Sequence, residues 1–197
     1  MNFLAHFYLA GNEPDLLVGN FIADAVKGNA LNDYSDGIRR GIVMHRNIDH
    51  FTDTHPVTAR SKNLLREEFN HYSGVIVDVF YDHFLAKNWR EFSKEPLADY
   101  SQRIYRFLGE RQHEFPERPR TMLPFMKQHD WLMAYSEIEG IHRVMTGMSR
   151  RVRHESKMEQ SAAALVRHYD LFENDFREFF PGLIAHTEHF REAEAGQ

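Results

Sequence analysis

Histidine and aspartate are concentrated in residues 45–55, where three histidines and two aspartates occupy eleven positions. In a helix each residue advances 100°, so His45 and Asp49 lie one turn apart on an otherwise apolar side of the segment. Burying a histidine and a carboxylate without partners is costly, so they are expected to contact each other, a metal, or charged groups of another helix. A His–Asp pair that only joins two helices is an open alternative for this segment taken alone.

A second segment with the same character spans residues 74–86, where Asp78, Asp82 and His83 interrupt a run of apolar residues. A helix that is apolar all round is a buried helix, and Asp78 and Asp82 lie one turn apart on it. Two neighbouring buried carboxylates repel each other unless one is protonated. A divalent metal removes this repulsion by binding both, with neutral histidine completing the ligand set. We therefore favour a metal site between two helices over purely structural pairs.

The residue types that are missing narrow the chemistry further. The chain has no cysteine, which excludes disulfides, thiolate nucleophiles and cysteine-based zinc sites. It also contains no Gly-x-Ser-x-Gly elbow, phosphate-binding loop or dinucleotide fingerprint. A metal bound by His, Asp and Glu, such as Mn²⁺, Mg²⁺, Fe²⁺ or Zn²⁺, then favours metal-assisted hydrolysis. In that reaction an aspartate accepts the proton of the attacking water, and arginines hold the phosphate.

Helical spacing of apolar residues predicts the elements that position these side chains. His6 lies in a short buried helix over residues 2–10 and is interpreted as a core residue. Asp24, in an apolar run over residues 15–27 with a bend at 19–20, is expected to face inward. His50 and His55 are interpreted as surface residues. Further helices are expected over residues 36–53, 56–69, 72–89, from 96 onward, 131–148, and 161–189 with a kink at Pro181, and a loop over 115–124.

Length and composition indicate one all-α helical-bundle domain over residues 1–197. No apolar run approaches the roughly 20 residues of a membrane span. Residues 1–6 lack the features of a signal peptide, so a cytoplasmic protein without a membrane partner is expected. The net charge of −5 argues against a nucleic-acid partner. Two basic clusters are either solvated faces or binding surfaces: Arg39, Arg40 and Arg46, and then Arg143, Arg150, Arg151, Arg153, His154 and Lys157.

Five blocks of the sequence resemble the acyl carrier protein phosphodiesterase family, and with the overall length they cover nearly the whole chain. They are Met1-Asn-Phe-Leu-Ala-His6, Gly19-Asn-Phe-Ile-Ala-Asp24, Met44-His45-Arg46-Asn-Ile-Asp49 with Thr52-Asp53, Asp78-Val-Phe-Tyr-Asp82-His83-Phe-Leu85, and Gly147-Met-Ser-Arg-Arg151. The resemblance implies an all-helical relative of the HD-type phosphohydrolases. It also implies removal of the 4'-phosphopantetheine arm from holo-acyl carrier protein, a reaction of fatty acid metabolism, with a divalent metal, preferentially manganese.

Carried over by position, the resemblance implies roles for individual residues. Catalytic roles fall on Asp24, Asp82 and His83, metal binding on His45, Asp49 and Asp78, and secondary roles on His6 and Asp53. Phosphate or partner binding is expected of Arg46, Arg150 and Arg151. Two other functions are kept as alternatives: an HD-like hydrolase of a small phosphorylated metabolite or nucleotide, and a helical metal-binding protein without turnover. An acidic carrier protein should need the exposed basic residues, whereas a nucleotide should not.

Overall fold

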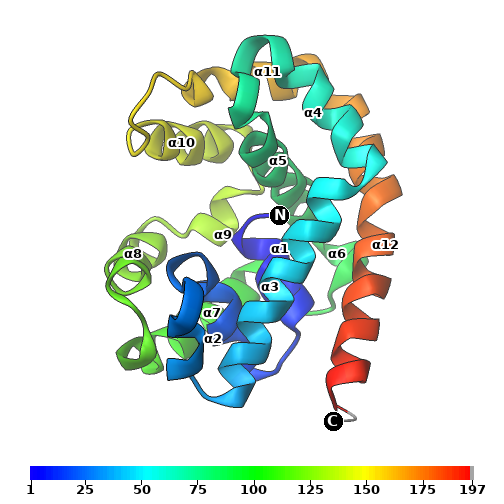
Figure 1. Cartoon of the computed structure of the whole chain (residues 1–197). Helices are drawn as coiled ribbons and strands as arrows, with labels where there is room; N and C mark the ends of the chain where they lie inside the picture. The colour runs from blue at the N-terminus through cyan, green and yellow to red at the C-terminus, as the bar shows by residue number, and fades with distance from the viewer. Residues whose placement is uncertain (196–197) are drawn as a thin grey trace.

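The computed structural model describes residues 1–195 and confirms the predicted all-α fold, with no strand in that range (Figure 1). No helix among these residues has the length and apolarity that crossing a membrane would require. The α-helices are α1 (Phe3–Ala10), α2 (Pro14–Ile22), α3 (Asp36–Thr54), α4 (Pro56–Phe69), α5 (Ser73–Lys87), α6 (Trp89–Phe92), α7 (Leu97–Glu110), α8 (Glu117–Gln128), α9 (Trp131–Ala134), α10 (Ile138–Ser149), α11 (Ser161–Arg167) and α12 (Tyr169–Ala195).

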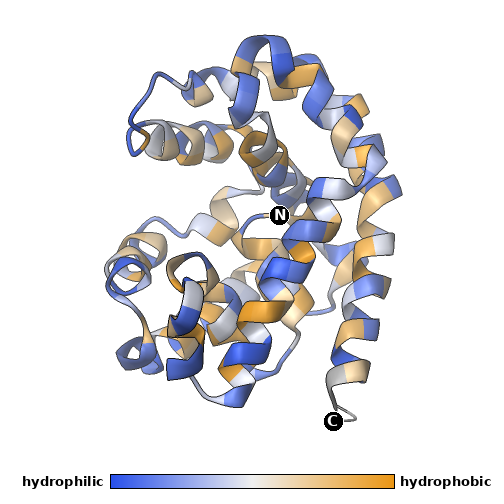
Figure 2. Cartoon of the chain, viewed as in Figure 1, coloured by the Kyte–Doolittle hydropathy of each residue, from blue (hydrophilic) through white to orange (hydrophobic). Residues whose placement is uncertain are grey.

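The central helix is α5, which the sequence predicted to be buried because it is apolar on all sides. It packs against α1, α4, α10 and α12, and its side chains from Val79 to Leu85 are at most 2% exposed. Figure 2 shows the apolar residues of the surrounding helices gathered on their inward sides, with hydrophilic residues outside. The buried apolar side chains form one continuous cluster around α5.

Helices α2 and α3 pack against each other through glycine. A Cβ atom added at Gly19 would lie 2.6 Å from the Cα of Gly41, so a larger residue at either position would push the helices apart. The side chain of Ser35 accepts the backbone N–H of Ile38 and caps α3, and Pro56 follows its end. The contact between Gly19 and Gly41 brings the end of α2 beside α3.

The prediction of a loop over residues 115–124 is wrong, because α8 occupies most of this segment. Pro116 precedes the helix and Pro119 lies in its first turn, where a backbone N–H would have no partner in the helix. Only Pro124 is interior, and the helix continues through it. The prolines were read as helix breakers, whereas two of the three occupy positions that tolerate them.

Two predicted helices are each divided in the structure. Residues 131–148 form α9 and α10, because the Tyr135 carbonyl accepts a hydrogen bond from His83 (2.7 Å) where a continuous helix would bond within itself. Residues 161–189 are interrupted at His168, whereas α12 passes through Pro181. The segment is therefore two helices where one was expected, and the kink at Pro181 stays a prediction. Tertiary contacts at Tyr135 override the helical spacing of the sequence.

Candidate metal centre

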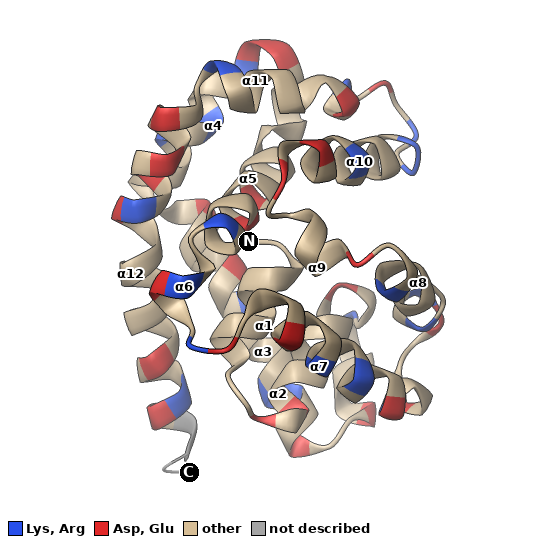
Figure 3. Ribbon diagram, turned by 180° about the vertical axis from the view of Figure 1, so that it is seen from behind, with Lys and Arg blue, Asp and Glu red and all other residues tan. Residues whose placement is uncertain are grey.

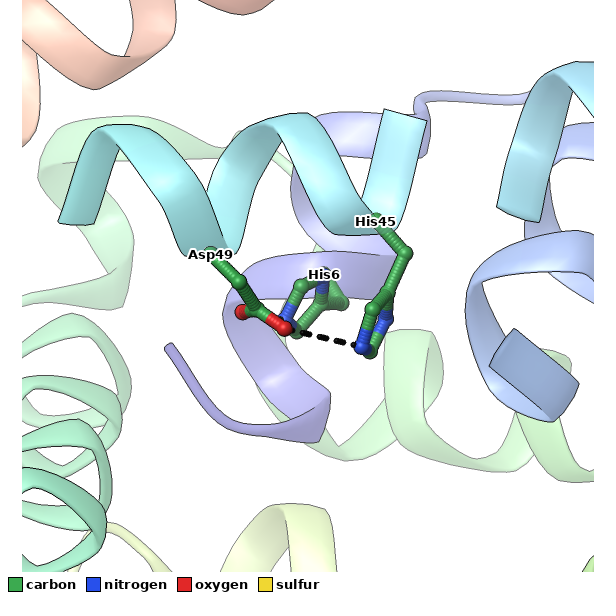
Figure 4. Close-up of side chains that lie close together, drawn as sticks. All are labelled: His6, His45 and Asp49. Carbon is green, nitrogen blue, oxygen red and sulfur yellow. Dashed lines mark hydrogen bonds and ion pairs between the residues drawn. The ribbon is translucent and has the colours of Figure 1, made fainter. Parts of the chain in front are cut away.

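Two histidines and one aspartate converge from α1 and α3. Figure 4 shows His6 beneath α3, facing His45 and Asp49. The His45 Nε2 lies 3.1 Å from Asp49 Oδ2, and the His6 Nε2 lies 3.2 Å from Asp49 Oδ1. The two imidazole rings stack with their centroids 3.9 Å apart. One nitrogen of each histidine and one oxygen of Asp49 lie within 4.8 Å of one another, as the ligands of a single ion must.

His6 reaches this cluster because α1 is anchored on α5. The carboxylate of Asp82, which is fully buried, accepts the backbone N–H groups of Leu4 (2.8 Å), Asn2 and Ala5 (both 3.3 Å). N–H groups at the start of a helix have no acceptor within the helix itself, and a carboxylate at this position also complements the helix dipole. His6 itself is 2% exposed. It was interpreted mainly as a core residue, and the structure shows it buried and also in the cluster.

The two stacked histidines differ in basicity. Burial and the neighbouring charge of His45 lower the pKa of His6 to about 4. Burial alone would lower the pKa of His45 too, but hydrogen bonds to Asp24 and Asp49 outweigh it and raise that pKa to about 9. The same histidines hold the pKa of Asp49 below its usual range although burial would raise it. The cluster therefore contains a charged carboxylate and a protonated histidine, and a metal ion must displace the proton of His45 to bind its nitrogen.

Asp24 stands at the edge of this cluster, with Oδ1 3.5 Å from His45 Nε2. The expectation that it faces inward is wrong, since its side chain is 78% exposed. The apolar neighbours Ala23 and Val26 are buried in its place, because the 3-10 helix η1 (Ala23–Ala25) turns the carboxylate outward. The hydrogen bond to His45 lowers the pKa of Asp24, so it is charged at neutral pH.

Of the three predicted site residues on α5, only Asp78 lines the cavity beside the cluster. Its Oδ1 lies 3.0 Å from the Met1 amino group, which is also 3.7 Å from Asp49. His83 is buried elsewhere, between the Tyr135 carbonyl and the Tyr169 hydroxyl, which lies 2.8 Å from its Nε2. Neither His83 nor Asp82 lines the cavity, so the structure does not bring these two residues to the centre predicted for them.

The cluster opens into a cavity of about 860 Å³. Its apolar wall comes from three helices that follow one another in the chain: Met122 and Phe125 of α8, Trp131 of α9, and Val144 and Met148 of α10. Three arginines also line it: Arg118 of α8, Arg143 of α10 and Arg151 just beyond α10. Figure 3 shows basic residues on α8, on α10 and on the segment after α10. We call Arg118, Arg143 and Arg151 the cavity arginines.

The cavity arginines agree only in part with the predicted basic residues. Arg151 lines the cavity with its guanidinium 5.3 Å from the centre of the Trp131 ring, whereas Arg150 does not. Arg46 lies outside it and donates to the Val26 carbonyl (2.8 Å). Arg118 was missed, because its segment was expected to be a loop. Asp53 lines the cavity and pairs with Lys62 (2.7 Å).

The remaining predicted surface residues lie away from the cavity. Arg39 pairs with Asp36 on the exposed side of α3, and Arg40 lies near the start of α2. Arg153, His154 and Lys157 are exposed in the segment after α10. His50 is exposed as expected, whereas His55 is half-buried and accepts the backbone N–H of Val57 at the start of α4.

The donor set fits a divalent transition-metal ion. Imidazole nitrogen and carboxylate oxygen are ligands for Mn²⁺, Fe²⁺ and Zn²⁺, whereas Mg²⁺ prefers an all-oxygen site. His6, His45 and Asp49 would hold the ion, with Asp24 next to it. The sequence predicted His45 and Asp49 as ligands, and the structure places them together.

The sequence matches the family model of acyl carrier protein phosphodiesterase over residues 1–183. Similar curated proteins carry the same name. One from Enterobacter sp. (strain 638) is 34% identical over 93% of this chain and 96% of its own length. One from Yersinia pestis is 32% identical over 96% and 98%, and one from Photorhabdus laumondii is 32% identical over 95% and 96%. No solved structure matches the chain significantly.

Proposed function

Because the chain belongs to the acyl carrier protein phosphodiesterase family, we propose that it hydrolyses the phosphodiester between 4'-phosphopantetheine and the serine of holo-acyl carrier protein. The products are apo-acyl carrier protein and free 4'-phosphopantetheine. The observation that supports this proposal is the convergence of His6, His45 and Asp49 at a cavity that also carries three arginines. A relation to the HD-type phosphohydrolases stays a prediction.

A divalent metal, with Mn²⁺ as our first choice and Mg²⁺ or Fe²⁺ as alternatives, would lower the pKa of a bound water and polarise a phosphoryl oxygen. Asp24 is suited to accept the proton of the attacking water. It is charged at neutral pH, it lines the cavity, and its exposed side chain can move without disturbing the core. Its Oδ1 lies 3.5 Å from the Nε2 of His45, one of the proposed metal ligands.

The rest of the cavity suits the other parts of this substrate. A linear arm attached to the phosphate needs more space than the reacting group alone, and the cavity of about 860 Å³ provides it beside an apolar wall from α8, α9 and α10. The cavity arginines provide positive charge for the phosphate and for an acidic carrier protein, although the whole chain carries −5.

The test is mass spectrometry of purified holo-acyl carrier protein after incubation with the protein and Mn²⁺. Loss of the mass of 4'-phosphopantetheine, prevented by EDTA and by His45→Ala, is the expected result. Nucleotides and small phosphate esters are incubated in parallel. Release of phosphate from these, with holo-acyl carrier protein intact, would establish the metabolite hydrolase in its place. Metal binding without any product would leave a metal-binding protein.

A further inference from the structure

Asn20 lies next to the candidate metal centre, but nothing in the sequence pointed to a role for it. It is the seventh residue of α2 and is 1% exposed. Its Nδ2 donates a hydrogen bond to the Leu16 carbonyl one turn earlier (3.0 Å), and its Oδ1 lies 3.1 Å from the Nδ1 of His6. Gly19, the preceding residue, packs directly against Gly41 of α3, so the depth of Asn20 is set by helix packing.

The orientation of the Asn20 amide follows from its two partners. A backbone carbonyl only accepts hydrogen bonds, so Leu16 must face the NH₂ group of Asn20. The amide oxygen is then the atom directed at His6, and it also only accepts. His6 must therefore carry a hydrogen on Nδ1. This assignment rests on the pattern of donors and acceptors and is independent of the basicity of the ring.

The hydrogen on Nδ1 determines what the other ring nitrogen can do. In neutral imidazole with Nδ1–H, the Nε2 atom presents a lone pair, and here it lies 3.2 Å from a carboxylate oxygen of Asp49. Two electron-rich atoms at this distance repel each other unless a proton or a metal ion lies between them. No comparable hydrogen bond fixes the tautomer of His45, because its Nδ1 is buried without a hydrogen-bond partner in the described part of the chain.

We propose that Asn20 is a positioning residue that keeps a hydrogen on His6 Nδ1 and thereby directs the Nε2 lone pair to a divalent metal ion shared with Asp49. The inference rests on the metal centre of the proposed function, and it adds the residue that prepares one ligand. Hydrogen bonds of this kind to the second nitrogen fix both the tautomer and the ring orientation of a metal-bound histidine. Asn20 never contacts the ion itself.

The first experiment reads the tautomer in the wild-type protein. Two-dimensional NMR correlation of the ring nitrogens and carbons of ¹⁵N-labelled histidine distinguishes a protonated from an unprotonated nitrogen, and His6→Gln assigns the signals. We expect His6 to carry its hydrogen on Nδ1 in the metal-free protein at neutral pH. Adding Zn²⁺, which is diamagnetic, should shift the Nε2 resonance and leave Nδ1 protonated. An Nε2–H tautomer in the metal-free protein, or an Nε2 signal unchanged by Zn²⁺, would overturn the proposal.

The second experiment compares two substitutions of Asn20 by calorimetric titration with Zn²⁺ and Mn²⁺. Asn20→Leu removes the acceptor at similar size, and it should raise the metal Kd about 10- to 100-fold, which is the usual effect of losing such a partner. Asn20→Asp keeps an acceptor oxygen for His6 although it loses the hydrogen bond to Leu16, so its Kd should stay clearly closer to wild type than that of Asn20→Leu. Thr58→Val is the matched control, because it removes a fully buried hydroxyl group on α4, outside the cavity, and should leave the Kd unchanged.

The substitutions separate positioning from a merely structural role. If Asn20→Leu does not fold, Asn20→Asp and the wild-type spectrum still decide, because loss of metal binding in Asn20→Asp would contradict the proposal. Wild-type affinity in a folded Asn20→Leu would overturn it as well. Neither readout uses hydrolysis. A protein with the expected tautomer and affinities that fails to cleave holo-acyl carrier protein would refute the proposed reaction and leave the role of Asn20 intact.

Discussion

The stacked rings of His6 and His45 contact the same carboxylate and yet differ in basicity, with pKa values of about 4 and about 9. Burial lowers both pKa values, and the neighbouring charges then separate them. His45 has two carboxylates within 3.5 Å, Asp49 and Asp24, whereas the charge of His45 itself opposes protonation of His6. At neutral pH the metal-free centre therefore holds a proton on His45, and a metal must displace it.

Metal affinity should depend steeply on pH for this reason. His45 must lose one proton when the ion binds, so the Kd is expected to fall about tenfold per pH unit from about pH 6.5 until the pKa of about 9 is reached. The folding stability of the metal-free protein depends on pH in the opposite direction. The folded pKa lies above the unfolded value of 6.5, so the stability from His45 is complete below pH 6.5 and is lost as pH rises through 9. Calorimetric titrations and thermal melts across pH 6 to 9.5 check both trends, and a Kd independent of pH would contradict the assignment.

Substituting Asp24 should change activity far more than stability, because its side chain is exposed. Asp24→Asn should lower kcat by at least about 100-fold, as expected for loss of a general base, whereas loss of its exposed charge beside His45 should cost at most about 1 kcal/mol of stability. Asp33→Asn, an exposed aspartate outside the cavity, is the control. Steady-state kinetics and urea unfolding are the measurements. Near wild-type turnover in Asp24→Asn would assign the proton to another group.

At the scale of elements, α5 supports the centre more than it takes part in it. Asp82 fixes the N-terminus of α1, and His83 bonds the end of α9 and the start of α12. Burial raises the pKa of Asp82 to about 7, although three backbone N–H groups favour its charged form. The catalytic roles of Asp82 and His83 stay predictions, and the geometry gives both residues the task of joining helices.

Loss of the hydrogen bonds between Asp82 and α1 should lower the stability of the fold. Asp82→Ala leaves buried N–H groups of α1 without an acceptor, which should cost about 3 kcal/mol in the free energy of unfolding and weaken metal binding through His6. Asp82→Asn retains one acceptor oxygen and should lose less. Urea unfolding with metal titration measures both. If Asp82→Ala keeps wild-type stability and metal affinity but loses turnover, the catalytic interpretation is the correct one.

At the scale of the whole molecule, the net charge of −5 conceals an uneven distribution. Histidine and aspartate side chains form the candidate metal centre, and the cavity arginines come from α8, α10 and the segment after α10 (Figure 3). A negative protein that binds an acidic partner needs such a local positive surface, and salt screens its attraction within about 8 to 10 Å.

The cavity arginines should therefore show two distinct behaviours. Arg118→Ala and Arg143→Ala are expected to raise KM about two- to fivefold at low salt, with a smaller effect at high salt. Arg151→Ala should also lower kcat, because a contact with the phosphate strengthens as charge develops in the transition state. Arg106→Ala, on the exposed side of α7 and outside the cavity, is the control. Unchanged kinetics in all three cavity variants would remove both roles.

The sequence by itself determined the elements and the contacts within single helices. The helical spacing of apolar residues predicted α3, α4 and α5 to within one or two residues of their ends. It also placed His45 and Asp49 together, because residues four apart on a helix are always neighbours. The absence of cysteine limited the ligands to nitrogen and oxygen.

Only the tertiary structure decided which residues of different helices meet. His6 and Asp49 are 43 positions apart, and Asp82 bonds Leu4 across 78. Spacing along the chain carries no information about such pairs, because they depend on how deeply each helix packs. For the same reason Asp24 and Asp82, two carboxylates in similar apolar runs, differ in their exposure to solvent. A turn of 3-10 helix exposes Asp24 to the cavity, whereas the N-terminus of α1 covers Asp82.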